Sequence, residues 1–127
     1  MTVIIMHGTM GTPEGNWFPW LKNELEHQGV KALTPQFPTP KEQSLTSWLK
    51  VLDTYKDEFD SNLVLVGHSI APALILQKLQ KLDKPIRGII LVSGWLGKIG
   101  LADYDKLNKT FFEGFLTGIR LKLTREK

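Results

Sequence analysis

The 127-residue sequence contains no cysteine. This absence excludes disulfide bonds, thiolate metal sites and a cysteine nucleophile. It also fits a protein of a reducing compartment, so we expect a cytoplasmic location. Long apolar runs are missing too: the opening residues 1–6 are apolar, but they lack a basic flank and are too short for a signal sequence or a membrane span. We therefore expect no membrane association.

An excess of charge of one sign is missing from most of the chain. Residues 1–118 carry equal numbers of basic and acidic side chains, and the whole net charge of +3 lies in residues 119–127. A short basic segment can bind phosphate backbones, but a few charges at a terminus are more often only solvated. We therefore expect no nucleic-acid partner. With 42% hydrophobic and 23% charged residues, residues 1–127 fit one globular domain.

Apolar runs and helical spacings alternate along the chain. Stretches rich in apolar residues predict strands at 3–6, 30–33, 63–66 and 86–92, and those at 3–6 and 63–66 are continuous apolar runs. Spacings of three and four residues predict helices at 17–28, 45–59 and 72–82. In the first helix we expect Asn16 as the N-cap and the tryptophans Trp17 and Trp20 in the core. The order βαβαβαβ predicts an α/β fold, in which a parallel sheet of about four strands has helices on both faces.

Gly67-His68-Ser69-Ile70-Ala71 lies where the third strand runs into the third helix. A tight corner of this kind needs small residues two before and two after the serine, and it raises the hydroxyl above the sheet. Ser69 is therefore a candidate nucleophile, although Ala71 departs from the G-x-S-x-G pattern. The alternative is that Ser69 only caps the helix that follows.

The carboxyl ends of the first and third strands are expected to meet. In open parallel sheets ligands bind where the strand order reverses, and the natural arrangement places these two strands side by side with the second strand outside the first. The first loop, His7-Gly8-Thr9, then lies beside Ser69. The backbone N–H groups of Ile70 and Thr9 can converge on an oxyanion, where each donor contributes about 3 kcal/mol to transition-state stabilisation.

Three histidines are candidates for a general base. His7 could serve Ser69, but a histidine in a glycine-rich loop after an early strand more often shapes that loop. The side chain of His68 should point away from Ser69, so we expect it to pack or to form hydrogen bonds. His27 lies late in the first helix, where a cationic ring suits the helix dipole, and nothing recommends it for catalysis.

Four segments in this order and spacing resemble a known family: His7-Gly8-Thr9-Met10, residues 17–21 (WFPWL), Gly67-His68-Ser69 and residues 88–94 (GIILVSG). They are similar to the small α/β-hydrolases grouped with the retinoblastoma-binding serine hydrolase, especially the bacterial members, over residues 2–95. The resemblance implies an α/β-hydrolase fold of three layers and a Ser-His-Asp triad with Ser69 as nucleophile. It also implies small ester or amide substrates, and neither a cofactor nor a metal is expected.

In that family the triad acid and histidine follow the fourth strand, each at the end of a further strand. This chain ends before either could appear, so we expect an incomplete hydrolase domain that lacks the last strands and has little or no turnover. Asp103 and Asp105 follow the fourth strand too closely to be assigned as the acid, and no histidine lies beyond His68. Without cysteine there is no L-x-C-x-E motif, so a partnership with retinoblastoma protein is not carried over.

Residues 116–127 form a basic tail that we interpret as an out-of-frame reading. Codons can be chosen for this segment that, read from the third base, give D-W-D-K-I-K-A-N-A-R-K, which resembles the family sequence before the strand that bears the acid. The alternative is a genuine short amphipathic tail, and the coding DNA decides between the two.

Two functions of different classes remain open from the sequence. One is a serine hydrolase that acts on a small-molecule acyl substrate. The other is a catalytically inactive α/β-hydrolase-fold protein that binds a ligand or partner. We also expect self-association, because the fourth strand is rich in Ile, Leu and Val and lacks the charge or proline that normally protects a sheet edge.

Overall fold

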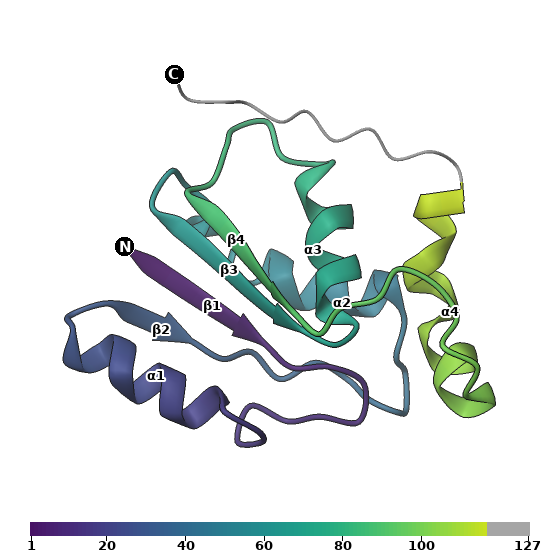
Figure 1. Cartoon of the computed structure of the whole chain (residues 1–127). Helices are drawn as coiled ribbons and strands as arrows, with labels where there is room; N and C mark the ends of the chain where they lie inside the picture. Colours follow the sequence, from purple (N-terminus) through teal and green to yellow (C-terminus); the bar gives the residue numbers. More distant parts are fainter. Residues whose placement is uncertain (117–127) are drawn as a thin grey trace.

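The structure is a computed structural model that describes residues 1–116. It contains a single sheet with helices packed around it (Figure 1). The strands are β1 (Thr2–Met6), β2 (Lys31–Leu33), β3 (Leu63–His68) and β4 (Gly88–Val92). The helices are α1 (Phe18–His27), α2 (Leu45–Asp53), α3 (Ala71–Leu79) and α4 (Ala102–Leu116), with a short 3-10 helix at Lys56–Glu58.

The four strands are parallel and lie in the order β2-β1-β3-β4. The expected neighbours are therefore confirmed, with β1 beside β3 and β2 outside β1. Met6 is paired with Gly67, so the end of β1 lies level with the turn that follows β3. Each crossover contains a helix, which parallel strands require because a short hairpin cannot join them. The predicted α/β class of fold, a parallel sheet of four strands, is confirmed.

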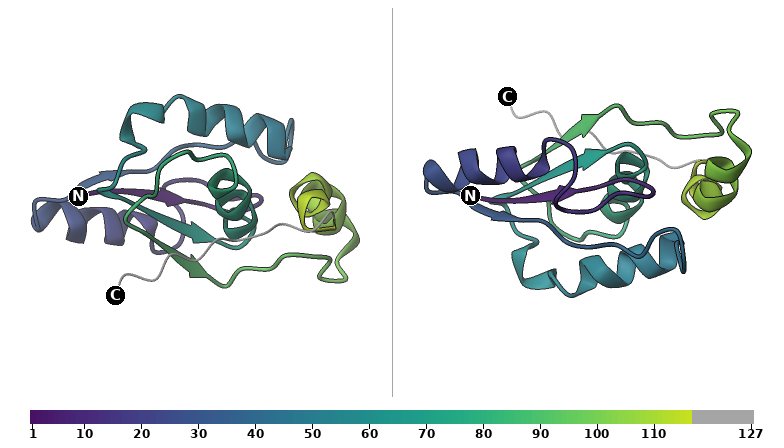
Figure 2. Two further views of the ribbon diagram at one scale, coloured as in Figure 1. Left: turned by 90° about the horizontal axis from the view of Figure 1, so that it is seen from above. Right: turned by 90° about the horizontal axis from the view of Figure 1, so that it is seen from below.

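Alternate residues of the central strands face opposite layers, as the period of two in a strand requires. One face carries the larger core, in which β1 and β3 pack against α2, α3 and α4. The other face carries a smaller core, in which Val3, Ile5 and Val66 pack against Phe18 of α1. The two views along the sheet in Figure 2 show α1 on one side and α2 on the other. The molecule is therefore layered as predicted.

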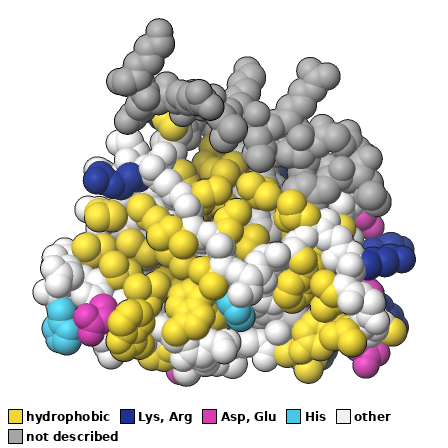
Figure 3. Space-filling model, in the orientation of Figure 1, with side chains coloured by type: hydrophobic (Ala, Val, Ile, Leu, Met, Phe, Trp, Pro, Cys, Tyr) yellow, Lys and Arg dark blue, Asp and Glu magenta, His cyan; other side chains and the backbone are white. Residues whose placement is uncertain are grey.

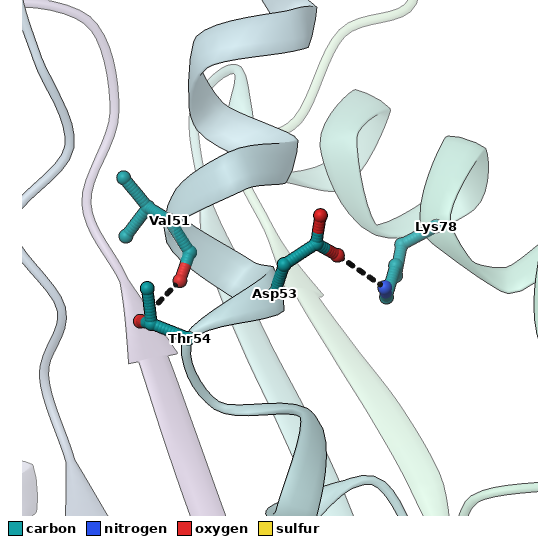
Figure 4. A network of polar contacts seen from close by, with 4 residues as sticks. All are labelled: Val51, Asp53, Thr54 and Lys78. Atoms are coloured by element: carbon teal, nitrogen blue, oxygen red, sulfur yellow. Dashed lines mark hydrogen bonds and ion pairs between the residues drawn. The ribbon is translucent and has the colours of Figure 1, made fainter.

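Helix α2 begins with a capping box. The Ser44 side chain accepts a hydrogen bond from the Ser47 N–H, and the Ser47 side chain accepts one from the Ser44 N–H, which satisfies two otherwise unpaired donors. At its other end α2 is linked to α3, because Lys78 contacts the Asp53 carboxylate at 3.3 Å (Figure 4). Ser44 is thus the N-cap of α2.

The start of α1 differs from the prediction. Trp17, not Asn16, occupies the N-cap position, and no side chain caps the helix. Asn16 instead adopts a left-handed conformation, with a φ of 47°. Phe18 is the buried aromatic residue of this helix, and Trp20 is 64% exposed, so its expected place in the core is wrong. The physical reason is phase: Phe18 faces the sheet, and Trp20, two residues later on a helix of 3.6 residues per turn, points away.

Helix α4 was not predicted, and it docks at the carboxyl end of the sheet (Figure 1). Phe111 is fully buried and packs edge-to-face on Trp48 of α2, with ring centroids 5.1 Å apart. The Thr110 hydroxyl accepts a hydrogen bond of 2.9 Å from the Leu45 N–H, and the Gln77 side chain donates to the Phe111 carbonyl at 3.3 Å. These contacts fix α4 against both α2 and α3.

Strand β4 forms one edge of the sheet among the described residues. Three of its apolar side chains are exposed, namely Ile89 at 37%, Ile90 at 54% and Leu91 at 43%. Figure 3 shows a broad hydrophobic area on the face that carries β4 in Figure 1. The edge thus has the exposed apolar character expected from its sequence.

None of the helices in the part of the chain that the structure describes is long and apolar enough to cross a membrane. The hypothesis of an aberrant tail concerns residues 116–127, of which 117–127 lie outside the described residues.

Candidate active site

Ser69 occupies the sharp turn between β3 and α3. Its φ is 66°, in the left-handed region that a non-glycine residue adopts only with strain. Its backbone N–H donates a hydrogen bond of 3.1 Å to the Val92 carbonyl at the end of β4. This hydrogen bond ties the turn to the neighbouring strand, so the surrounding sheet holds the strained conformation in place.

The turn leaves no room for larger side chains at its two ends. A Cβ on Gly67 would lie 2.6 Å from Ile75 Cδ1 and 3.2 Å from Ala71 Cβ. Both distances are tighter than ordinary van der Waals contact. The helix therefore crosses close above the strand, which explains why small residues stand at positions 67 and 71.

The first loop packs directly on Ser69. A Cβ on Gly8 would lie 2.6 Å from Ser69 Cβ and 2.9 Å from Ser69 Oγ. The expected juxtaposition of this loop with the serine is therefore present in the fold. Gly8 is the residue that permits it, because any side chain here would push the loop and the hydroxyl apart.

Two backbone N–H groups were expected to face an oxyanion beside Ser69. Ile70 is the N-cap residue of α3, so its N–H is not used within the helix. In the first loop the Met10 N–H donates to the Thr39 hydroxyl at 2.8 Å, which removes Met10 as a donor and keeps Thr9 as the candidate. Met10 also has a left-handed backbone, with a φ of 63°, so the loop bends sharply at this point.

His7 is buried at the start of the first loop, and both its ring nitrogens form hydrogen bonds. Nδ1 lies 2.8 Å from the Gly8 carbonyl, to which it must donate, and Nε2 accepts the Phe37 N–H at 2.9 Å. The ring is therefore the neutral Nδ1–H tautomer. Burial lowers the pKa of His7, against smaller opposing effects of the Gly8 hydrogen bond and of Glu14. This arrangement shapes the loop and leaves no nitrogen to deprotonate Ser69.

The other two histidines are not placed to act as the base for Ser69 either. His68 packs edge-to-face on Trp17 and Phe18, with ring centroids 5.8 Å and 5.7 Å away, on the α1 side of the sheet. Burial lowers the pKa of His68. His27 is the last residue of α1, which leads into the start of β2, at the opposite end of the sheet from Ser69.

Neither aspartate after β4 is placed like a triad acid. Asp103 is exposed in the first turn of α4. The Asp105 carboxylate accepts the Ile99 N–H at 2.8 Å and the Gly100 N–H at 3.1 Å, so it stabilises the chain just before the helix. Within residues 1–116 there is also no group of three His, Cys, Asp or Glu side chains that could hold a metal ion.

Sequence reasoning missed a polar network behind the first loop. Gln43 donates to the Thr9 hydroxyl at 2.9 Å and to Asn108 Oδ1 at 2.8 Å, and the Thr9 hydroxyl donates to Asn108 Oδ1 at 2.5 Å. The Thr39 hydroxyl, which holds the Met10 N–H, donates to Gln43 at 2.7 Å. Thr9 and Asn108 are 99 positions apart, so no sequence spacing could have revealed their contact.

The parallel sheet in the order β2-β1-β3-β4, with helices on both faces and a strained serine turn after β3, matches part of an α/β-hydrolase fold. The family model for serine hydrolases matches residues 3–111, and the chain belongs to this family. The match extends into α4, beyond the residues 2–95 over which the sequence motifs showed a resemblance.

The relatives agree with this assignment. The chain is 40% identical over 95 residues to the protein YdeN of Bacillus subtilis (strain 168), which covers 73% of this chain. The crystal structure of the ydeN gene product superposes with a TM-score of 0.73 at 34% identity, over 85% of this chain and 60% of that one. An extracellular α/β-hydrolase from a Paenibacillus species shares the fold, with a TM-score of 0.62 at 21% identity, over 75% of this chain and 41% of that one. The sequence spans about half the length of YdeN.

Proposed function

We propose that this chain carries the nucleophile and the oxyanion hole of a serine hydrolase for small esters or amides with short acyl groups. Ser69 Oγ is the nucleophile, and the N–H groups of Ile70 and Thr9 receive the oxyanion. One observation carries the proposal: Ser69 is held at a φ of 66° on the turn after β3, with Gly8 packed against its hydroxyl. Membership of the serine hydrolase family supports it.

In this proposal Ser69 Oγ attacks the acyl carbon, and the substrate carbonyl oxygen becomes the oxyanion. Collapse of this intermediate expels the alcohol or amine and leaves an acyl group on Ser69, which water then removes. The serine proton must pass to a base. Because His7 and His68 pack within the fold and His27 lies at the opposite end of the sheet, we place the base and its acid outside residues 1–116.

Labelling by a fluorophosphonate probe tests the nucleophile. Because the base lies outside residues 1–116, we expect slow labelling that stops at one adduct per chain, measured by intact mass, and we expect peptide mapping to locate the adduct on Ser69. Ser69→Ala should abolish the adduct, whereas Ser93→Ala should retain it, because Ser93 also has a left-handed backbone but lies at the end of β4. An adduct that persists in Ser69→Ala would refute the assignment.

Steady-state hydrolysis tests the missing base. An ordinary esterase turns over its substrate about 10 times per second. We expect the 127-residue chain to hydrolyse short-chain esters far more slowly, because the Ser69 hydroxyl stays protonated. In a protein with a complete carboxyl end, Ser69→Ala should remove at least about three orders of magnitude of the rate. Ordinary turnover by the 127-residue chain would show that His7 or a partner chain supplies the base.

The second candidate function is a binding protein with a catalytically inactive hydrolase fold. It is favoured by the engagement of both His7 nitrogens within the fold. The probe separates the two functions, since a pure binding protein would not be labelled at Ser69. The expected cytoplasmic location stays a prediction from the absence of cysteine.

A further inference from the structure

Asn108 lies on α4 and is fully buried, yet it faces polar atoms of the first loop. Its Oδ1 accepts two hydrogen bonds, one from the Thr9 hydroxyl and one from the Gln43 side chain. Gln43 Nε2 can only donate, so in this arrangement the Asn108 oxygen, and not its nitrogen, faces Gln43. The hydrogen bonds therefore run from donors on Thr9 and Gln43 to an acceptor on α4.

The network holds Thr9, whose N–H is the candidate oxyanion donor, at two points. On one side Asn108 and Gln43 hold the Thr9 side chain. On the other side Thr39 accepts the Met10 N–H and itself donates to Gln43. The left-handed backbone of Met10 follows directly after these anchors. The position of Thr9 is thus set by residues from two separate parts of the chain, the segment 39–43 and α4.

A packing role does not explain Asn108 well. Its Nδ2 is buried and has no hydrogen-bond partner among the described residues, which is an unfavourable arrangement for a donor. A leucine of similar size would fill the same space without this cost. What the asparagine provides instead is its Oδ1, which accepts the hydrogen bonds from Thr9 and Gln43.

We infer that Asn108 is a positioning residue, which acts through Thr9 and Gln43 to hold the first loop in the geometry that the oxyanion hole requires. This inference rests on the proposed function, because it concerns the same oxyanion hole. It makes α4 part of the active site, and it assigns Gln43 and Thr39 to the same unit.

The test compares two substitutions on α4, Asn108→Leu and Thr110→Val. Thr110 is the matched control, because its hydroxyl holds the start of α2 and takes no part in the network around the first loop. For each protein the labelling of Ser69 by the fluorophosphonate is resolved into a maximal rate constant and an apparent affinity. We expect Asn108→Leu to lower the rate constant at least tenfold with little change in affinity, and Thr110→Val to leave the rate constant unchanged.

Two further measurements keep the inference falsifiable. Gln43 is partly exposed and lies outside the helices, so Gln43→Ala should fold even if Asn108→Leu does not. Gln43→Ala removes the hydrogen bonds of Gln43 to Thr9 and Asn108, and it should lower the rate constant in the same way. Amide hydrogen exchange over residues 8–10 should become faster in Asn108→Leu and Gln43→Ala but not in Thr110→Val.

The possible failures are distinguishable. If the unsubstituted chain is not labelled at Ser69, the proposed function is wrong, and exchange over residues 8–10 alone decides whether Asn108 holds the loop. If the unsubstituted chain is labelled and both network variants react at the same rate, the proposed function stands and the positioning role of Asn108 is overturned.

Discussion

Gly8 is the residue at which the first loop and the candidate nucleophile are closest. We expect Gly8→Ala to lower the rate of Ser69 labelling about tenfold or more and to destabilise the fold by about 1–3 kcal/mol, because the new methyl group would lie 2.6 Å from Ser69 Cβ. Probe kinetics and urea unfolding measure the two effects. Gly88→Ala is the control, since a Cβ there meets no atom within 4 Å. Equal behaviour of the two variants would show that the loop does not depend on this contact.

The lowered pKa of His7 predicts how the free energy of unfolding depends on pH. Burial lowers its pKa, so below about pH 6.5 the unfolded chain binds a proton that the folded chain does not. Its contribution is therefore fully present above that pH, and the free energy of unfolding should fall as the pH decreases, by at most about 1.4 kcal/mol per pH unit for one histidine.

Urea unfolding between pH 7.5 and 5 measures this slope, and His7→Gln should make it shallower. A residual slope is expected, because burial also lowers the pKa of His68. If His7→Gln has the same slope as the unsubstituted chain, then His7 is not the group whose protonation limits stability.

At the scale of elements, we expect the packing of α4 on the rest of the fold to depend mainly on one aromatic residue, Phe111. Phe111→Ala removes a fully buried ring that packs against Trp48, so we expect a loss of about 3–5 kcal/mol in the free energy of unfolding. Leu101→Ala is the control, because Leu101 is 57% exposed just before the helix and should change stability by about 0.5 kcal/mol or less. Equal, small losses would mean that α4 is not docked as described.

At the scale of the whole molecule, the β4 edge predicts self-association. An edge strand with exposed Ile89, Ile90 and Leu91 and without charge or proline presents unpaired backbone groups to another chain. We expect concentration-dependent oligomers in sedimentation velocity, and we expect Ile90→Lys to reduce them. Thr46→Lys adds the same charge at an exposed position on α2 and should have no effect. A strictly monomeric chain at high concentration would contradict this prediction.

The sequence by itself determined the order of the elements, the strand order and the turn that carries Ser69. Each depends on residues close together in the chain, such as an apolar run, a helical spacing or the small residues Gly67 and Ala71. Crossover rules then convert that order into one topology. Local patterns also located the first loop beside Ser69, because the carboxyl ends of neighbouring parallel strands share one edge.

Only the tertiary structure decided which polar groups are free to act. The environment of His7 depends on Phe37, thirty residues away, and the support of Thr9 depends on Asn108, so neither could be read from spacing. The exposure of Trp20 and the docking of α4 were also beyond sequence patterns, because both follow from how an element is rotated and packed. Burial and hydrogen bonding between distant segments form only when the chain is folded, and they distinguish a histidine that shapes a loop from one that could serve as a base.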